Sequence, residues 1–442
     1  MFQKIAVLGS GTMGSQIAVL LASHGFPCLL FDIKSENGVD SLAQDNISRL
    51  FGLNPSLAYE SSVVNLISPL NYDEHLEKLS QANWVIEAVS EDLTTKIDLW
   101  KKVSPHLNSQ AIISTNTSGL SIDNLVYSLP RNQRSRFLGT HFFNPPKHLK
   151  LLELIPSKHT DKQVVSEIKS FCENSLNRGI VFANDVPGFV ANRIGCYGLL
   201  SAIKAIDRFD FGFDQADLVT GPLIGRPKSA TFRTLDLIGL DIFQNICQNI
   251  MENVANAWEK QAFKLPEYIF NMIDADMIGQ KCGQGFFKKV EDGNGQKQIL
   301  CLDKSHMEYV PTSKLNSAFL TSAKQQDSTV TKISSVLNSD DPSAQFAKQV
   351  VLETLWYAAN KVGETTNEIS GIDNAMKWGF GWELGPFEIW DSIGVEKIGS
   401  LISESIGNLP EWVQQSTKQG RYFYLRSDGK TSILGPSGYR EL

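Results

Sequence analysis

Short apolar runs alternate with amphipathic stretches through the first third of the chain. The apolar runs cover residues 5–8, 28–31, 63–67, 84–89, 111–114 and 137–142, and helical patterns lie between several of them, for example at 13–23 and 94–103. Apolar runs bounded by polar segments are typical of strands that are buried on both faces of a parallel sheet. The pattern therefore predicts a doubly wound α/β sheet.

From about residue 187 the pattern changes to long helical segments, at 188–207, 231–258 and 344–362. The chain before the last of these is rich in Gly, Ser, Asp and Lys, which indicates a hairpin followed by a polar linker. We therefore expect four segments: an α/β domain at 1–184, a helical domain at 185–287, the hairpin and linker at 288–343, and a second helical domain with a C-terminal tail at 344–442.

The two helical domains share a short sequence repeat. Phe232-Arg-Thr-Leu-Asp-Leu-Ile-Gly239 matches Phe387-Glu-Ile-Trp-Asp-Ser-Ile-Gly394, at an offset of 155 residues (387 minus 232). Two isolated matches also arise by chance. Because each copy follows a helical stretch and a turn containing Gly or Pro, we interpret the match as duplication of a helical domain.

Composition and charge narrow the class of protein. The chain has 442 residues, of which 42% are hydrophobic and 20% are charged, and this balance predicts a globular protein with several domains. The net charge of -7 argues against a broad basic face for nucleic acid or an anionic membrane. Six scattered cysteines without a C-x-x-C pair indicate free thiols and no metal site. With no leader and no run of roughly 20 apolar residues, we expect a cytoplasmic protein without membrane insertion.

A glycine-rich segment follows the first predicted strand. Gly9-Ser-Gly11-Thr12-Met13-Gly14 opens the first predicted helix, and Asp32 follows Gly14 by 18 residues at the end of the next strand. In a G-x-G-x-x-G turn the glycines let backbone N–H groups approach a pyrophosphate at the helix N-terminus. Asp32 would accept hydrogen bonds from the adenosine ribose and repel a 2′-phosphate, so the predicted cofactor is NAD rather than NADP. The alternative is an ordinary tight turn with a solvated Asp32, and the neighbouring Lys34 also bears on cofactor preference.

Polar residues gather at the carboxyl ends of three further predicted strands. They are Glu87, Glu91 and Lys96 at and after the fourth strand, Asn116 and Ser118 after the fifth, and His141 and Asn144 at the end of the sixth. Open α/β sheets bind their ligands at this edge. One such cluster is an ordinary loop, whereas three clusters at one edge predict a site.

His141 has a candidate partner twelve residues later. Glu153 lies within the apolar run Leu151-Leu-Glu-Leu-Ile155. A carboxylate in a buried strand is costly unless it is paired, so we expect it to meet a histidine. The alternative is a Glu153 that faces solvent from an edge strand.

Taken together, these motifs resemble those of the 3-hydroxyacyl-CoA dehydrogenase family of fatty-acid β-oxidation. The matching segments are Gly9-Ser-Gly-Thr-Met-Gly14 with Asp32, Ile86-Glu-Ala-Val-Ser-Glu-Asp-Leu93 with Lys96, Thr115-Asn-Thr-Ser118, His141-Phe-Phe-Asn-Pro145, Leu152-Glu-Leu-Ile155, Asp185-Val-Pro-Gly-Phe-Val-Ala-Asn-Arg193 and Lys281-Cys-Gly-Gln-Gly-Phe-Phe287. They occur in the family's order over roughly residues 3–290. The duplicated helical domain resembles the dehydrogenase portion of longer proteins that fuse this activity to an enoyl-CoA hydratase. The implied fold is a Rossmann-like doubly wound sheet followed by two all-α helical domains.

The resemblance also implies a reaction, the NAD-dependent oxidation of an (S)-3-hydroxyacyl-CoA thioester to 3-oxoacyl-CoA. His141 would be the general base, and Glu153 would hold its imidazole in one tautomer. Ser118 and Asn192 would hydrogen-bond the reacting oxygen or the thioester carbonyl. The residues that would bind the cofactor or line the adjoining substrate pocket are Gly9, Gly11, Thr12, Met13, Gly14, Asp32, Glu91, Lys96 and Asn116.

Structural interpretations of the same residues compete with these roles. Ser118 would then be a helix cap, Asn192 a buried helix contact, Lys96 a solvated charge on its helix, and Glu91 a carboxylate at a helix start.

Coenzyme A contacts are where the sequence departs from the family. Many members carry a lysine-rich helical excursion between the second and third strands, but the corresponding stretch here, residues 35–62, is short and has only Lys34 and Arg49 close by. We therefore expect the phosphate contacts to come from elsewhere, for example from Arg226 or Lys228.

Other functions and assemblies stay open at this point. A dehydrogenase acting on a free 3-hydroxy acid and a catalytically silent NAD-binding structural protein are the alternatives to the acyl-CoA enzyme. Short members of the family dimerise through one helical domain, so a second copy in the same chain predicts a monomer, with dimerisation as the alternative.

Overall fold

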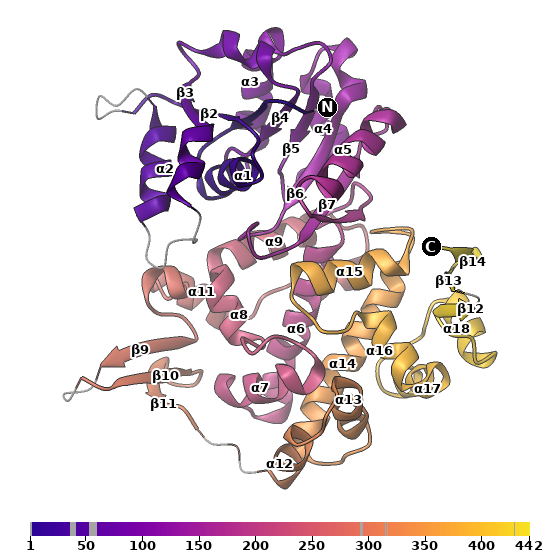
Figure 1. Ribbon diagram of the computed structural model, residues 1–442. Helices are drawn as coiled ribbons and strands as arrows, with labels where there is room; N and C mark the ends of the chain where they lie inside the picture. Colours follow the sequence, from indigo (N-terminus) through magenta and orange to yellow (C-terminus); the bar gives the residue numbers. More distant parts are fainter. Residues whose placement is uncertain are drawn as a thin grey trace. The chain divides into compact units, whose positions relative to one another are not determined.

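The chain divides into two units, Met1–Phe189 and Val190–Leu442, which follow each other in the colour sequence of the ribbon in Figure 1. This computed structural model describes residues 2–35, 41–52, 60–291, 295–313, 315, 317–427 and 429–442. The finer division into four segments stays a prediction.

The first unit is built on one eight-stranded sheet with the order β3-β2-β1-β4-β5-β6-β7-β8. The first six strands are parallel, β7 runs antiparallel to β6, and β8 is parallel to β7. The order 3-2-1-4-5-6 is that of a Rossmann sheet, which confirms the predicted fold class. The strands are β1 (Ile5–Leu8), β2 (Cys28–Asp32), β3 (Ile67–Asn71), β4 (Trp84–Glu87), β5 (Ile112–Thr115), β6 (Phe137–Phe142), β7 (Leu151–Pro156) and β8 (Gly179–Phe182).

The prediction of a third strand at 63–67 is wrong. Residues Ser61–Leu66 form a 3₁₀ helix, and the strand β3 begins only at Ile67. Val63, Val64 and Leu66 pack against the core beside the first helix. Their apolar run reflects burial against a helix, which periodicity over so few residues does not distinguish from burial in a sheet.

Helices cover both faces of this sheet (Figure 1). The bounds are α1 (Thr12–Ser23), α2 (Leu42–Gly52), α3 (Leu93–Val103), α4 (Ile122–Leu125) and α5 (Lys162–Asn174). One core cluster joins residues of α1 and α5 to Val7, Ile86 and Leu138 of the sheet. On the other face, Trp100 of α3 packs edge-on against Phe137. Because side chains alternate along a strand, Glu87, His141 and Glu153 lie on this second face.

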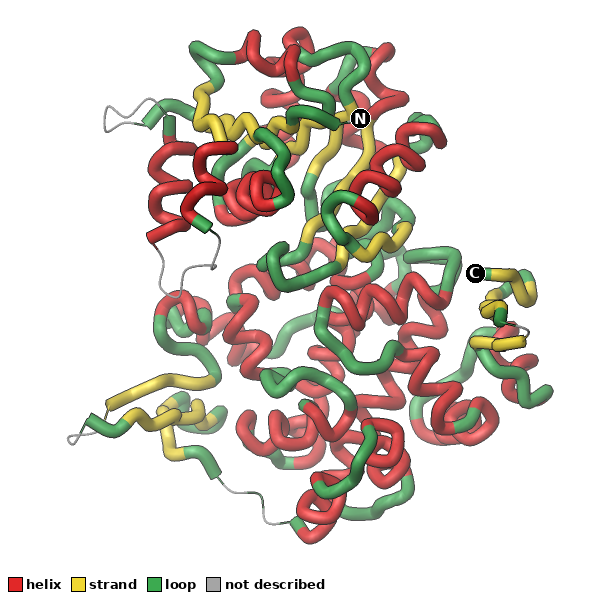
Figure 2. Tube along the Cα trace, in the orientation of Figure 1, coloured by secondary structure: helices red, strands yellow, loops and turns green. Residues whose placement is uncertain are grey.

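The second unit is mainly helical, with two small antiparallel sheets at its edges (Figure 2). Its first half contains α6 (Ala191–Phe209), α7 (Phe213–Thr220), α8 (Phe232–Ile238), α9 (Leu240–Asn253), α10 (Ala257–Ala262), α11 (Glu267–Asp274), β9 (Phe287–Glu291), β10 (Lys297–Asp303) and β11 (Glu308–Pro311). Its second half contains α12 (Ala318–Lys324), α13 (Thr329–Leu337), α14 (Pro342–Lys361), α15 (Ile369–Gly379), α16 (Pro386–Ile393), α17 (Val395–Ser405), α18 (Glu411–Lys418), β12 (Tyr424–Ser427), β13 (Lys430–Gly435) and β14 (Gly438–Glu441).

The structure differs from the sequence expectations for this unit in three places. The segment 288–343 is more than a hairpin and linker, because it holds β9–β11, α12 and α13, while Asp292–Asn294 of the expected turn lie outside the described residues. The expected helix at 231–258 is interrupted at Gly239, whose φ of 95° an L side chain rarely adopts. The helix expected from Gly188 begins at Ala191, because Gly188 and Phe189 are left-handed. Neither helical half is strictly all-α.

The sequence repeat corresponds to a repeated structure. α8 and α16 end at Gly239 and Gly394, whose φ values are 95° and 119°. Asp236 accepts hydrogen bonds from the N–H groups of Phe286 and Phe287, and Asp391 accepts them in the same way from Phe423 and Tyr424. In each half an aspartate therefore ties a helix to the first residues of a three-stranded sheet.

These two aspartates are expected to be matched stability determinants. Burial raises the pKa of each carboxyl to about 6, although the two backbone donors oppose this rise. Asp236→Ala and Asp391→Ala each leave two N–H groups without their acceptor, which costs roughly 2–4 kcal/mol of the free energy of unfolding. Denaturant unfolding followed by circular dichroism measures the loss. Asp207→Ala, which removes an exposed partner of Lys304, is the control, and equal small losses in all three variants would contradict the assignment.

Candidate active site

The glycine-rich turn joins β1 to α1 and leaves space at the start of that helix. Gly9 has a φ of 97°, and a Cβ there would lie 2.8 Å from the Ala88 carbonyl oxygen. A Cβ on Gly14 would lie 1.9 Å from the Gly9 oxygen, whereas a Cβ on Gly11 would meet nothing within 4 Å. Gly9 and Gly14 are thus required by close packing, and Gly11 lies where the backbone is open to a ligand. Thr12 and Met13 form the first turn of α1.

Asp32, at the end of β2, lies against this turn. Its Oδ2 accepts hydrogen bonds from the Ser10 N–H at 2.6 Å and the Ser10 hydroxyl at 2.5 Å. Asn46 of α2 donates to the same hydroxyl at 2.8 Å. Lys34 forms an ion pair with Glu74 on the surface, with an N–O distance of 2.5 Å. The carboxylate is therefore held beside the turn where a dinucleotide would place its adenosine ribose.

Glu87 is a buried carboxylate that the sequence analysis placed in a polar cluster at this edge but gave no role. It ends β4, is 0% exposed, and accepts hydrogen bonds from Lys96 Nζ and Thr115 Oγ1, both at 2.6 Å. The signal in the sequence was a glutamate that ends an apolar strand. Lys96 of α3 is 1% exposed, so the interpretation of Lys96 as a solvated charge is wrong.

Lys96 also connects Glu87 to Glu91. Its Nζ lies 3.4 Å from Glu91 Oε2, while Glu91 Oε1 accepts hydrogen bonds from the N–H groups of Ser118 and Gly119 and from the hydroxyls of Thr117 and Ser118. Burial opposes ionisation of Glu91, but Lys96 and the Thr117 hydroxyl outweigh it, so the pKa of Glu91 lies below its ordinary range. Glu91 thereby ties the turn after β5 to α3.

The helices that follow Glu91 and Ser118 are capped by other residues. The side chain of Asp92 caps α3, and that of Ser121 caps α4. The capping interpretation of Ser118 is therefore wrong, whereas Glu91 does lie at a helix start, directly before the cap of α3.

His141 and Glu153 form a buried pair. Antiparallel pairing of β6 with β7 places them directly opposite each other, and His141 Nδ1 lies 2.7 Å from Glu153 Oε2. Glu153 is 0% exposed on a strand that has neighbours on both sides, so the edge-strand alternative is wrong. The rings of Phe143 and Phe189 lie 4.4 Å and 5.7 Å from the imidazole. No residue in the described parts of the chain hydrogen-bonds His141 Nε2, so this nitrogen can exchange a proton with a ligand.

Asn116 joins the ends of three strands. Its N–H donates to the Glu87 carbonyl oxygen at 2.7 Å, and its Oδ1 accepts from the Phe142 N–H at 2.9 Å. The structure thus brings Glu87, Glu91, Lys96, Asn116, Ser118, His141 and Glu153 to the carboxyl edge of one sheet.

Asn192 belongs to the second unit, in the first turn of α6. It is 7% exposed, and its side-chain amide has no hydrogen-bond partner among the described residues, so its part in the site stays a prediction.

Arg226 does not supply coenzyme A contacts. It is buried, its guanidinium donates to the Gly198 carbonyl oxygen and to Thr354, and it lies 4.5 Å from the ring centroid of Trp382. The Arg226 guanidinium is held by partners inside the second unit, so the expectation that Arg226 contacts the coenzyme A phosphates is wrong. Lys228 is exposed. Most of the short stretch at 35–62 lies within the described residues, except 36–40 and 53–59.

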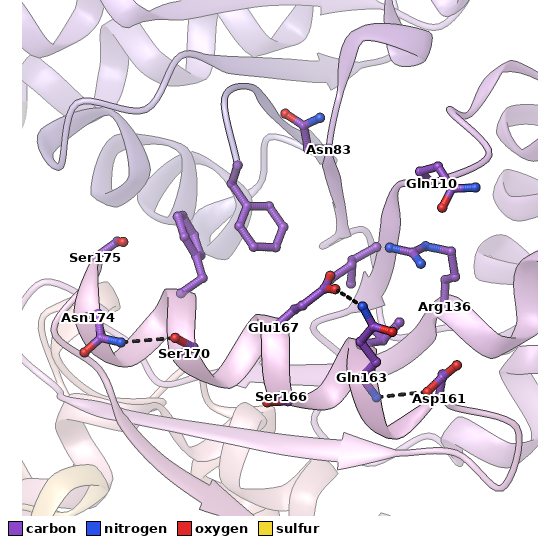
Figure 3. A pocket seen from close by; sticks show the side chains of 14 residues that line it. Asn83, Gln110, Arg136, Asp161, Gln163, Ser166, Glu167, Ser170, Asn174 and Ser175 are labelled. Carbon is purple, nitrogen blue, oxygen red and sulfur yellow. Dashed lines mark hydrogen bonds between the residues drawn. The ribbon is translucent and has the colours of Figure 1, made fainter.

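A pocket of about 830 Å³ opens at the other edge of the sheet (Figure 3). Asn83, Ile112 and Arg136 line it from the amino ends of β4, β5 and β6, and the polar face of α5 forms its opposite wall. It therefore lies away from the His141–Glu153 pair.

In the described parts of the chain no group of three or more His, Cys, Asp or Glu is arranged to hold a metal, and no described helix is long and apolar enough to cross a membrane.

Known families match most of the first 289 residues. Residues 4–186 match the family described as "3-hydroxyacyl-CoA dehydrogenase, NAD binding domain", and residues 188–289 match "3-hydroxyacyl-CoA dehydrogenase, C-terminal domain". Both matches agree with the fold and with the glycine-rich turn, because Gly9, Gly11, Gly14 and Asp32 fit a dinucleotide as a Rossmann domain binds it. The cofactor is therefore NAD.

Relatives and solved structures extend the similarity to nearly the whole chain. A "Probable 3-hydroxyacyl-CoA dehydrogenase" of Bacillus subtilis is 39% identical over 99% of this chain and 57% of its own length. A "Putative fatty acid oxidation complex trifunctional enzyme" of Rickettsia prowazekii is 31% identical over 92% of this chain and 56% of its own length. The crystal structure of 3-hydroxybutyryl-CoA dehydrogenase from Escherichia coli superposes with a TM-score of 0.68 at 20% identity, covering 95% of this chain and 99% of that one. The chain thus spans little more than half the length of the two relatives.

Asp32 is expected to set cofactor affinity and preference. Because a hydrogen bond to a charged group is worth about 1.5–3 kcal/mol, Asp32→Ala should raise the KM for NADH roughly tenfold or more. It should also reduce the preference of the enzyme for NADH over NADPH. Steady-state kinetics with both cofactors measure this. Asp45→Ala on α2, which loses a bond to Ser35, is the control. Equal use of NADH and NADPH by the unmodified protein would contradict the assignment.

Proposed function

Because the chain belongs to the 3-hydroxyacyl-CoA dehydrogenase family, we propose that it oxidises the hydroxyl of (S)-3-hydroxyacyl-CoA thioesters to give 3-oxoacyl-CoA, as a step of fatty-acid β-oxidation in the cytoplasm. The observation that carries the proposal is the buried His141–Glu153 pair at the carboxyl edge of an NAD-binding sheet. The name of the Rickettsia relative supports the place in fatty-acid oxidation.

Some residues of this edge would bind the cofactor, and others would bind the cofactor or the substrate. The turn from Gly9 to Gly14 and the carboxylate of Asp32 would hold the dinucleotide, and the nicotinamide supplies the hydride acceptor when it is bound there. Glu91, Lys96 and Asn116 would line its nicotinamide half or the adjoining substrate pocket. The ion pairs of Lys96 with Glu87 and Glu91, and the hydrogen bonds of Asn116, fix these side chains before any ligand arrives, and such preorganisation lowers the free energy of reorganisation on binding.

His141 is the proposed general base. Its Nε2 takes the proton of the 3-hydroxyl while the hydride leaves the 3-carbon, and in the reverse direction the same nitrogen returns the proton. Glu153 accepts a hydrogen bond from the Nδ1–H group, holds the imidazole in the tautomer with a basic Nε2, and stabilises the imidazolium that forms. Phe143 and Phe189 beside the ring exclude water from this proton transfer.

Ser118 and Asn192 are the proposed hydrogen-bond donors to the substrate. Their contacts would be with the reacting oxygen or the thioester carbonyl. The side-chain amide of Asn192 hydrogen-bonds no described residue, so it is available to a ligand, which supports this role.

A substrate comparison tests the proposed reaction. We expect NADH oxidation with acetoacetyl-CoA and with longer 3-oxoacyl-CoA thioesters, and little with acetoacetate. Turnover of acetoacetate at the rate of its thioester would favour a free-acid dehydrogenase instead, and NADH binding without any turnover would favour a structural protein.

Substitutions at the buried pair test the mechanism. His141→Ala and Glu153→Gln should each lower turnover by about 10²–10⁴, the usual contribution of general-base catalysis, while NADH affinity measured by calorimetry stays near that of the unmodified protein. His148→Ala, an exposed histidine in the following loop, is the matched control. Near-normal turnover of Glu153→Gln would remove Glu153 from the mechanism.

The second helical copy is proposed to make the chain a monomer. α6 and α14 pack closely, because the rings of Tyr197 and Tyr357 stack with centroids 3.8 Å apart and Gly198 lies against Thr354. An apolar helix face that would otherwise need a second subunit is covered within one chain. Light scattering at micromolar concentration should therefore give the mass of one chain, and a concentration-independent mass of two chains would contradict this.

A further inference from the structure

Five side chains form a cluster of charges in the second unit, of which four are buried and Glu364 is exposed. Arg193, which is 0% exposed, donates through Nε to Glu259 and to the Tyr357 hydroxyl, both at 2.8 Å, and through a terminal nitrogen to Glu364 at 2.6 Å. Lys361 donates to the second oxygen of Glu259 and of Glu364, both at 2.8 Å. Two cations therefore face two carboxylates, and the Tyr357 hydroxyl also donates to Glu259. We call these five residues the Arg193 cluster.

The cluster joins the two helical copies. Arg193 on α6 and Glu259 on α10 belong to the first copy, whereas Tyr357 and Lys361 on α14 and Glu364 just after it belong to the second. The second copy thus supplies three of the five side chains around the first turn of α6.

The first turn of α6 carries both Arg193 and Asn192. The residue before the helix, Val190, offers no side-chain cap, and Gly188 and Phe189 ahead of it are left-handed. The bonds of the Arg193 guanidinium hold this turn from its side, and Asn192 is the neighbouring residue in the same turn.

We propose that Tyr357, Lys361 and Glu364 of the second copy are positioning residues for the dehydrogenase reaction, which act by holding Arg193 and with it the turn that carries Asn192. The proposal rests on the proposed function, in which Asn192 hydrogen-bonds the substrate. It gives the second copy a share in catalysis in addition to its covering of an apolar face.

The chemistry of the cluster favours positioning over stability alone. Buried ion pairs often stabilise a fold no better than apolar side chains of similar volume, but their directional bonds permit one arrangement. Arg193 uses its planar guanidinium in three such bonds, which fixes both its position and its orientation.

Paired substitutions separate positioning from general stability. Tyr357→Phe removes one hydroxyl from the cluster, and Tyr424→Phe is its matched control, because the Tyr424 hydroxyl also donates to a buried carboxylate of the second copy, Asp373. Lys361→Met and Lys377→Met form a second pair, since Lys377 bonds Glu388, which is not a member of the Arg193 cluster. We expect kcat with acetoacetyl-CoA to fall about 3- to 10-fold in Tyr357→Phe and about 10- to 100-fold in Lys361→Met, as misplacement by a fraction of an ångström to 1 Å would cause. The KM for NADH and the kcat of both controls should stay unchanged.

A double-mutant cycle with Asn192→Ala tests the route of the effect. If the cluster acts through Asn192, Tyr357→Phe lowers kcat much less in the Asn192→Ala background than in the unmodified protein. Equal losses in both backgrounds, or losses in the controls that match those in the cluster variants, overturn the proposal while the proposed function stands. Absence of turnover of acetoacetyl-CoA by the unmodified protein would overturn both.

Discussion

Burying a carboxylate in a protein is costly unless cations, hydroxyls or backbone N–H groups surround it, and this constraint organises both units of the chain. In the first unit Glu87 at the end of β4 and Glu153 within β7 are fully buried, and each is paired with a basic side chain on the same face of the sheet. In the second unit Asp236 and Asp391 accept pairs of backbone N–H groups, and Glu259 accepts from two cations and a phenol. Where the partner is a histidine or a lysine at the ligand-binding edge, the same arrangement that satisfies the charge also orients a group for chemistry.

The second unit shows how a duplication can become asymmetric. Its two halves keep the same scaffold, with a helix that ends at a left-handed glycine, an aspartate one turn earlier and a three-stranded sheet that the aspartate binds. Only the first half carries the Asn192-Arg193 pair, and the second half faces it with Tyr357 and Lys361. A repeat that had lost all contact with the reaction would need only apolar packing here. The cluster of charges gives a physical reason for polar residues on this buried face of α14.

Much of the candidate site could be predicted because its residues obey local rules. A glycine-rich turn after an apolar strand, and an aspartate at the end of the next, are determined by backbone geometry and are visible in a window of a few dozen residues. His141 and Glu153 could be paired because an acid in an apolar run needs a partner. Glu87 was placed in a polar cluster but given no role, because its partners Lys96 and Thr115 come from two other elements.

The sequence by itself determined the sheet-and-helix alternation, the dinucleotide turn, the repeat and the family. These features depend on the chemistry of neighbouring residues or on a spacing that one strand or helix fixes. Only the tertiary structure decided that residues 61–66 pack as a 3₁₀ helix beside the sheet. It also decided that Arg226 hydrogen-bonds Thr354 inside the second unit, and that Arg193 is held by a helix more than 150 residues away. In each case the outcome depends on which distant side chain fills the remaining space and satisfies the remaining charge, and no local pattern contains that information.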